Sequence, residues 1–194
     1  MKQFLTLLCA IAMLCRFVAA QQNHSQALYI NDRLPDITLH HLVNYPSGSA
    51  KLSVLQTGNT KMVVFGFWLT SCAPCIRRFP LLDSLQNRFQ KDLQIILVTP
   101  EKTEVIENFL EKWKARNQKP FTIPIVTADT LIQQYFREQS KPNYVWLARD
   151  NVYIAHSSST FLSADLIEKA IPLMNEQVKQ RGYLKYENQN NVIK

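Results

Sequence analysis

Two cysteines separated by a dipeptide are the residues of this chain best suited to chemistry. They end the segment Phe67–Cys75, which reads FWLTSCAPC. An apolar run stops just before them and a helical pattern starts just after, so Cys72 is expected at a helix N-terminus. Backbone N–H groups and the helix dipole stabilise a thiolate there, and such thiols have pKa values of about 3.5 to 7.5 rather than about 8.5. Cys72 is therefore the predicted nucleophile.

Cys75 is predicted to resolve the mixed disulfide that Cys72 forms with a partner. It stands one helical turn further along the chain, on the side expected to face inward. Attack of its thiolate on Cys72 releases the reduced partner and closes an intramolecular disulfide. No bound cofactor is expected, because the electrons reside on sulfur and must come from a partner protein.

Two other uses of the cysteine pair are open. Half of a zinc site would need two more ligands, which only His24, His40, His41 and His156 could complete. Zinc ligands usually come in closely spaced pairs, and adjacent histidines on a strand point to opposite faces, so no metal is expected. A purely structural disulfide is disfavoured because the loop that it would close is minimal.

The first 20 residues are typical of a secretory signal. A basic residue near the start is followed by an apolar run over residues 4–15 and by Val18-Ala19-Ala20, which suits cleavage after residue 20. An uncleaved membrane anchor is the alternative, but a spanning helix needs roughly 20 apolar residues. Lipid attachment is weakly supported, since Cys9 and Cys15 both follow leucine. We therefore expect an exported chain, periplasmic or otherwise extracytoplasmic.

Removal of the signal would leave 174 residues, which suit one domain. We expect a polar leader over 21–33, a domain over 34–179 and a poorly ordered polar tail over 180–194. The net charge falls from +7 to +5 on cleavage, and the remaining basic residues are interleaved with acidic ones. No nucleic-acid partner is expected from this pattern. The sequence sets no oligomeric state.

Strand and helix patterns alternate around the cysteines. Residues 62–68 lack charged and strongly polar side chains, which predicts a central strand buried on both faces. Apolar residues then recur every three or four positions, which predicts a helix over 73–90 with a kink at Pro80. A strand over 93–99 and a helix capped by Thr103 follow. This alternation favours a parallel sheet covered by helices.

Shorter patterns complete the expected order of elements. They predict a strand at 35–39, a strand or extended loop at 121–126, a short helix at 131–136 and a hairpin of strands at 143–147 and 152–156. Ser163 is then expected to cap a final helix that ends near residue 179.

The FWLTSCAPC segment, followed about seventy residues later by Lys141-Pro142-Asn143-Tyr144-Val145, resembles the TlpA and ResA group of thioredoxin-like proteins. These are exported bacterial thiol-disulfide oxidoreductases, and the likeness covers roughly residues 34–179. It implies an α/β fold: a thioredoxin-like three-layer α/β/α sandwich with a central mixed sheet and an N-terminal strand extension. In that family the later proline is cis and lies beside the cysteines, where the backbone of the preceding residue pairs with the substrate. The resemblance thus implies substrate-binding roles for Pro142 and Lys141.

Four positions near the cysteines bear on how the pair would react. Trp68 could belong to the core or to a substrate face, and we favour a shielding role beside the nucleophile at a half-exposed edge. Thioredoxins bury an acid where Gly66 stands, and many ResA-like proteins carry glutamate where Arg78 stands. Both usual carboxylates are therefore missing. Arg77 and Arg78 would favour a thiolate if they lie near the cysteines, and otherwise face solvent.

The predicted function is disulfide exchange with exported protein thiols, on the reducing side to which the Ala73-Pro74 dipeptide leans. Electrons would come from an unidentified donor, for which a membrane thiol reductase is one candidate. A thiol peroxidase on the same fold is one alternative, although Leu69-Thr70-Ser71 lacks the Pro and Thr arrangement of peroxiredoxins. A redox-inactive binding module is the other, and the intact cysteine pair counts against it.

Overall fold

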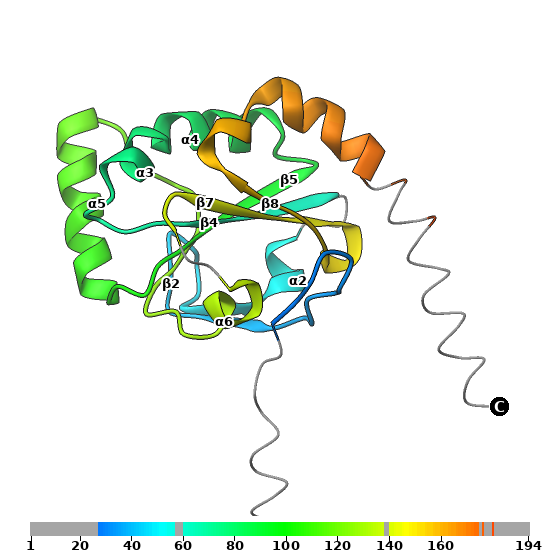
Figure 1. Cartoon of the computed structure of the whole chain (residues 1–194). Helices are drawn as coiled ribbons and strands as arrows, with labels where there is room; N and C mark the ends of the chain where they lie inside the picture. Colours follow the sequence, from blue (N-terminus) through cyan, green and yellow to red (C-terminus); the bar gives the residue numbers. More distant parts are fainter. Residues whose placement is uncertain (1–26, 57–59, 138–139, 175, 177–179, 181–194) are drawn as a thin grey trace, which may run out of the picture.

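The computed structural model describes residues 27–56, 60–137 and 140–174, together with residues 176 and 180 (Figure 1). The expected signal peptide, residues 21–26 of the polar leader and nearly all of the C-terminal tail lie outside these residues. Among the described residues, no helix has the length and apolar character that a bilayer crossing requires.

Within the described residues, the main sheet has six strands in the spatial order β2–β6–β5–β4–β7–β8. Their bounds are Leu42–Val43 (β2), Met62–Phe67 (β4), Leu93–Val98 (β5), Ile125–Val126 (β6), Asn143–Ala148 (β7) and Val152–Ser158 (β8). β4, β5 and β6 are parallel, whereas β7 is antiparallel to β4 and β8 is antiparallel to β7. The mixed sheet implied by the resemblance is confirmed. The parallel pairing expected from the strand–helix alternation is confirmed for β4 and β5, and the predicted hairpin of β7 and β8 adds antiparallel strands at one side.

β4 lies between β5 and β7, and all six of its residues are buried. Successive side chains of a strand point to opposite faces. Met62 and Val64 accordingly belong to one core cluster, while Val63 and Phe65 belong to the other. A strand covered on both faces needs apolar side chains throughout, which is why its continuous apolar run could be recognised in the sequence.

Helices cover both faces of the sheet and complete the three layers (Figure 1). One face carries α3 (Ala73–Arg77), α4 (Phe79–Arg88), α5 (Thr103–Asn117) and a final helix over residues 164–174. The other face carries α2 (Leu52–Leu55) and α6 (Ile132–Phe136). The α/β/α architecture expected from the resemblance is confirmed.

The N-terminal extension contributes a second, two-stranded sheet. β1 (Thr38–His40) pairs antiparallel with β3 (Ser49–Lys51), which leads directly into α2. Leu39 of β1 is buried in the core cluster beneath α2 and α6. The strand predicted at 35–39 is therefore present, but it begins at Thr38.

The helix predicted after the cysteines is divided where Pro80 required a kink. α3 ends and α4 begins at Arg78, whose backbone N–H donates to the carbonyl of Cys75 at 3.0 Å. Pro80 then occupies the first turn of α4, where a missing backbone N–H breaks no intrahelical hydrogen bond. The division lets one apolar side run from the cysteines to the end of α4.

The predicted cap of α5 is wrong. Lys102 is the residue before the helix and Thr103 is already its first residue, with no side-chain cap. The Thr103 hydroxyl is instead 2.7 Å from the Thr127 hydroxyl, beyond the end of β6. Thr103 therefore links the start of α5 to the segment after β6 rather than satisfying the backbone of its own helix.

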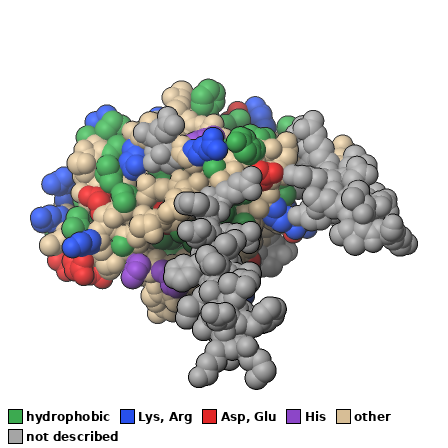
Figure 2. Space-filling view, turned by 60° about the horizontal axis from the view of Figure 1, so that its bottom comes forward, with side chains coloured by type: hydrophobic (Ala, Val, Ile, Leu, Met, Phe, Trp, Pro, Cys, Tyr) green, Lys and Arg blue, Asp and Glu red, His purple; other side chains and the backbone are tan. Residues whose placement is uncertain are grey.

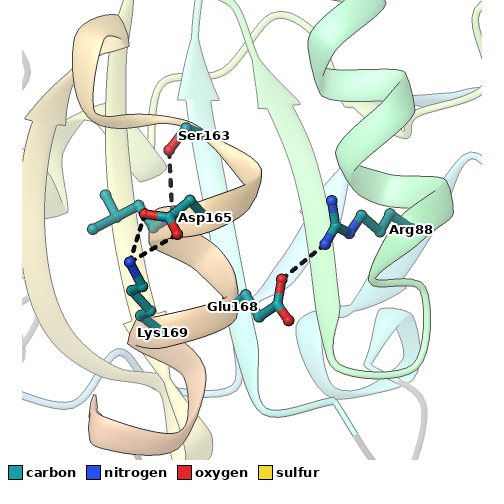
Figure 3. A network of polar contacts seen from close by, with 6 residues as sticks. Arg88, Ser163, Asp165, Glu168 and Lys169 are labelled. Atoms are coloured by element: carbon teal, nitrogen blue, oxygen red, sulfur yellow. Dashed lines mark hydrogen bonds and ion pairs between the residues drawn. The ribbon is translucent and has the colours of Figure 1, made fainter.

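The final helix begins as predicted, because the Ser163 hydroxyl accepts the N–H of Leu166 at 3.3 Å. Figure 3 shows its link to α4, in which Arg88 binds Glu168 at 2.8 Å. Both side chains are more than half exposed, and surface pairs of this kind contribute little stability. The helix is held mainly by apolar residues such as Ile167, which is fully buried.

The surface carries mixed charge. On the face shown in Figure 2, Lys and Arg side chains stand in separate small groups among acidic, polar and hydrophobic ones. This distribution agrees with the interleaved charges of the sequence.

Candidate active site

A disulfide joins Cys72 to Cys75 where the chain passes from β4 to α3. The connecting turn is closed by the Cys72 N–H, which donates to the carbonyl of Leu69 at 3.0 Å. Cys72 is the N-cap of α3, and its Sγ accepts the backbone N–H of Cys75 at 3.3 Å. The predicted position of Cys72 at a helix start is confirmed, and the same N–H is placed to stabilise a thiolate after reduction.

The two sulfur-bearing residues differ in their exposure. Cys72 is half-buried, whereas Cys75 is 2% exposed and belongs to the core cluster under α3 and α4. A protein thiol or disulfide can therefore approach Cys72 but not Cys75. This asymmetry is what a nucleophile and a resolving cysteine need, since only the first must meet the partner.

Trp68 lies in the core, so the half-exposed position expected for it is wrong. Its side chain is 1% exposed, and its ring centroid is 4.9 Å from that of Phe79 and 5.2 Å from that of Phe109. The indole Nε1 is buried and has no hydrogen-bond partner among the described residues. Trp68 directly follows β4 and belongs to a cluster of aromatic side chains that includes Phe79 and Phe109.

The Lys141-Pro142 peptide bond is cis, as the resemblance implied. These residues directly precede β7, whose first residue Asn143 pairs with Phe67 at the end of β4. Lys141 and Pro142 are both half-buried. The register therefore brings this segment to the sheet edge from which the turn to Cys72 starts, and contact with a substrate remains a prediction.

Tyr144 lies beside Gly66, the position at which thioredoxins bury an acid. It pairs with Gly66 across β4 and β7, and a methyl group at Gly66 would lie 3.0 Å from its Cε1 and 2.8 Å from Cδ2 of Leu97. Burial raises the pKa of Tyr144 to about 12, an effect that the positive charge of Arg78 opposes. Arg78 is half-buried, whereas Arg77 is exposed. The space beside Gly66 thus holds a neutral phenol, and Arg78 places a positive charge near it.

Glu101, which was not predicted from the sequence, contacts the turn of residues 69–72 between β4 and α3, the active-site turn. Its carboxylate accepts the backbone N–H of Thr70 at 2.7 Å and the Thr70 hydroxyl at 2.6 Å. A signal for this contact was available in the sequence. Glu101 follows the strand β5 and Thr70 follows β4, and the carboxyl ends of neighbouring parallel strands meet at one edge of a sheet.

The zinc alternative gains no support from the structure. In the part of the chain that is described, no three or more His, Cys, Asp or Glu side chains are grouped so that they could hold a metal ion. His24 lies outside that part.

A family comparison agrees with this geometry. Residues 30–156 match the model of the AhpC/TSA family. The chain belongs to this family. It is also 28% identical over 105 residues to the thioredoxin-like protein YneN of Bacillus subtilis, a match that covers 52% of this chain and 58% of that protein. The match thus spans less than two thirds of the relative.

Solved structures share the fold. The thioredoxin domain of a thiol-disulfide oxidoreductase from Bacteroides vulgatus has a TM-score of 0.55 at 19% identity, covering 75% of this chain and 99% of that one. A secreted disulfide oxidoreductase of Mycobacterium tuberculosis scores 0.52 at 15% identity, with coverages of 71% and 96%. The reduced 2-Cys peroxiredoxin of Plasmodium vivax scores 0.58 at 14% identity, with coverages of 78% and 99%. The thioredoxin-like fold is confirmed, consistent with the predicted resemblance.

Proposed function

We propose that this chain is an exported thiol-disulfide oxidoreductase of the TlpA and ResA type, which acts on the reducing side through its Cys-Ala-Pro-Cys segment. The observation that carries the proposal is the disulfide between a half-buried Cys72 and a buried Cys75 at the start of α3. Export is supported by the signal-like residues 1–20 and by the likeness of the fold to a secreted disulfide oxidoreductase.

The reaction starts from the reduced pair. The Cys72 thiolate attacks one sulfur of a disulfide in an exported protein, which breaks that bond and releases one partner thiolate. The Cys75 thiolate then attacks Sγ of Cys72, breaks the mixed disulfide and releases the second partner thiolate. Two electrons pass to the partner, whose thiolates take up two protons, and the Cys72–Cys75 disulfide is left. A separate electron donor must return the pair to the dithiol.

Lys141 and Pro142 would shape the surface on which the partner lies. They reach the same sheet edge as the active-site turn because β7 pairs with β4 over its full length. In this proposal the Lys141 backbone pairs with the extended partner chain and Pro142 lines the approach to Cys72. The partners would be exported protein thiols or disulfides and a membrane thiol reductase as donor.

The test is the reduction potential of the pair, measured by equilibrating the purified protein with glutathione or dithiothreitol buffers and quantifying free thiols. A reductase should titrate as one two-electron couple near the thioredoxin value of about −270 mV, whereas a value near about −120 mV would reverse the proposed direction. Cys72→Ser should abolish exchange. Cys75→Ser should still attack a protein disulfide but accumulate as the mixed disulfide. If the pair does not cycle in any buffer, the proposal is wrong.

A thiol peroxidase is the second candidate, favoured by the structural likeness to the 2-Cys peroxiredoxin. In that reaction Cys72 would attack peroxide and become a sulfenic acid. The Cys75 thiol would then condense with this sulfenic acid to form the disulfide and water. Stopped-flow oxidation of the reduced protein by hydrogen peroxide separates the two functions. A reductase should react with a protein disulfide far faster than with peroxide, and the reverse order would favour the peroxidase.

A further inference from the structure

Glu101 ties the turn that carries the nucleophile to the neighbouring strand. Both of its carboxylate oxygens accept hydrogen bonds from Thr70, one from the backbone N–H at 2.7 Å and one from the hydroxyl at 2.6 Å. These lengths are those of charge-assisted hydrogen bonds to an ionised acceptor. Thr70 stands two residues before Cys72, inside the turn that the Cys72 N–H closes onto Leu69. The Glu101 carboxylate thus fixes this turn from the end of the neighbouring strand, β5.

The position of Glu101 is itself fixed by the sheet. Its backbone N–H donates to the Thr99 hydroxyl at 3.3 Å, and that hydroxyl is 3.2 Å from the carboxylate. Thr99 is fully buried and its N–H bonds the carbonyl of Val126. The Glu101 carbonyl accepts the N–H of Ala128 at 2.7 Å. Glu101 is thus held by three hydrogen bonds to its carboxylate and two to its backbone, so it has little freedom to leave the turn and acts as a rigid clamp.

We infer that Glu101 is a positioning residue for disulfide exchange, which fixes the turn before Cys72 and biases the Cys72–Cys75 pair toward the disulfide by its negative charge. The inference rests on the proposed function. The bias follows from the charges of the two redox forms: the disulfide is neutral, whereas the dithiol is stabilised when Cys72 ionises to a thiolate. A nearby anion disfavours that thiolate, and a less stable reduced form makes the pair a better reductant.

This clamp offers a reason for a reducing pair without the usual buried acid. The position of that acid holds Gly66, which packs against Leu97 and Tyr144 and leaves no room for a carboxylate there. Glu101 supplies a carboxylate from the other side, at the carboxyl end of β5. The charge is half-buried, where it is screened less than a fully exposed one.

Four versions of the full chain test this inference: wild type, Glu101→Gln, Thr70→Val and, as the matched control, Glu104→Gln. Glutamine keeps the shape of Glu101 but removes its charge. Glu104 is an exposed acid in the first turn of α5 and has no contact with the active-site turn in the hydrogen bonds described. For each reduced protein, the pH profile of iodoacetamide alkylation gives the Cys72 thiol pKa, and equilibration with glutathione gives the redox equilibrium constant.

Glu101→Gln should lower the Cys72 thiol pKa and shift the glutathione equilibrium about three- to tenfold toward the dithiol, the scale of one charge acting over several ångströms near a surface. Glu104→Gln should change neither value by more than about 1.5-fold, because an exposed charge further away is screened. Thr70→Val loosens the clamp while keeping the charge, so it should slow the attack of Cys72 on a small disulfide with little change in pKa. Urea unfolding of the oxidised proteins checks that each variant is folded.

The inference is overturned if Glu101→Gln and Glu104→Gln behave alike in both measurements, or if only the stability of Glu101→Gln changes. If Glu101→Gln does not fold, Thr70→Val decides: an unchanged rate of attack refutes the clamp. A wild-type protein that does not exchange with glutathione would refute the proposed function instead. The alkylation profiles would still test the effect of Glu101 on Cys72, so the two failures can be told apart.

Discussion

Gly66 stands where thioredoxins bury an acid, and replacing it with alanine tests why this chain has glycine there. The residue is the last but one of β4, opposite Tyr144 in β7. A methyl group there would lie 2.8 Å from Leu97 Cδ2 and 3.0 and 3.3 Å from two ring carbons of Tyr144. Leu97 and Tyr144 are 1% and 2% exposed, so neither can turn into solvent to make room.

The expected loss of stability follows from two opposing terms. Placing an extra methyl group in a packed core costs about 1–3 kcal/mol, because neighbours must leave their preferred rotamers. Alanine in a strand interior is favoured over glycine by about 0.5–1 kcal/mol, since glycine loses more backbone entropy on folding. Gly66→Ala should therefore lower the free energy of unfolding by about 1–2 kcal/mol. An aspartate at this position should destabilise more, because it adds a buried charge.

The assay is urea unfolding of the oxidised protein followed by tryptophan fluorescence. Gly48→Ala is the matched control: its added methyl group meets no atom within 4 Å and its backbone lies outside the positive-φ region, so its stability should stay unchanged or rise slightly. Leu97→Val shortens the side chain that makes the closest contact. The double variant with Gly66→Ala and Leu97→Val should therefore lose less free energy of unfolding than the two single variants lose together. A Gly66→Ala protein as stable as wild type would refute the steric explanation.

Two further changes test the surroundings of the cysteines. Trp68→Phe should lower the free energy of unfolding by about 1–2 kcal/mol, because the lost side-chain volume outweighs the removal of a buried, unpaired indole N–H. The rate of exchange with a small disulfide should stay within about twofold of wild type. A folded, fully stable variant with much slower exchange would show that the indole contacts the substrate. Tyr144 has its pKa raised from 10.0 to about 12 by burial, so the folded state keeps a proton that the unfolded chain loses above pH 10. Stability should therefore fall between about pH 10 and 12, by about 2–3 kcal/mol in total, and Tyr144→Phe should lack this part of the fall. Urea unfolding of both proteins at pH 9 and pH 11 measures the difference, and parallel losses would contradict the assigned burial.

Local patterns were sufficient for the cysteine pair and its immediate setting. The run that became β4 is apolar at every position because both of its faces are covered, and the helical spacing that starts after Cys72 follows from one buried side of α3 and α4. The kink near Pro80 needs only the missing backbone N–H of proline. Each of these features depends on residues within one or two turns of chain.

Other features required the resemblance or the sheet register. The cis bond before Pro142 was expected only from the TlpA and ResA pattern, because a proline at the start of a strand is compatible with either isomer. The mixed sheet likewise depends on β7 adding to β4 in the antiparallel direction, a pairing of segments about eighty residues apart. The burial of Trp68 depends on α4 and α5 closing over it, which its own neighbours in sequence do not reveal.

The sequence by itself located the cysteine pair on which the proposed chemistry depends, and the tertiary structure decided its surroundings. A Cys-x-x-Cys pair at a strand-to-helix junction is a local arrangement, so its residue types and spacing predict the reacting atoms directly. The groups around the pair come from distant parts of the chain: Tyr144 fills the space beside Gly66, and Glu101 reaches Thr70 across 31 residues of sequence. Only the pairing of β4 with β5 and β7 brings these residues together, because contacts between strands are set by register and packing rather than by spacing along the chain.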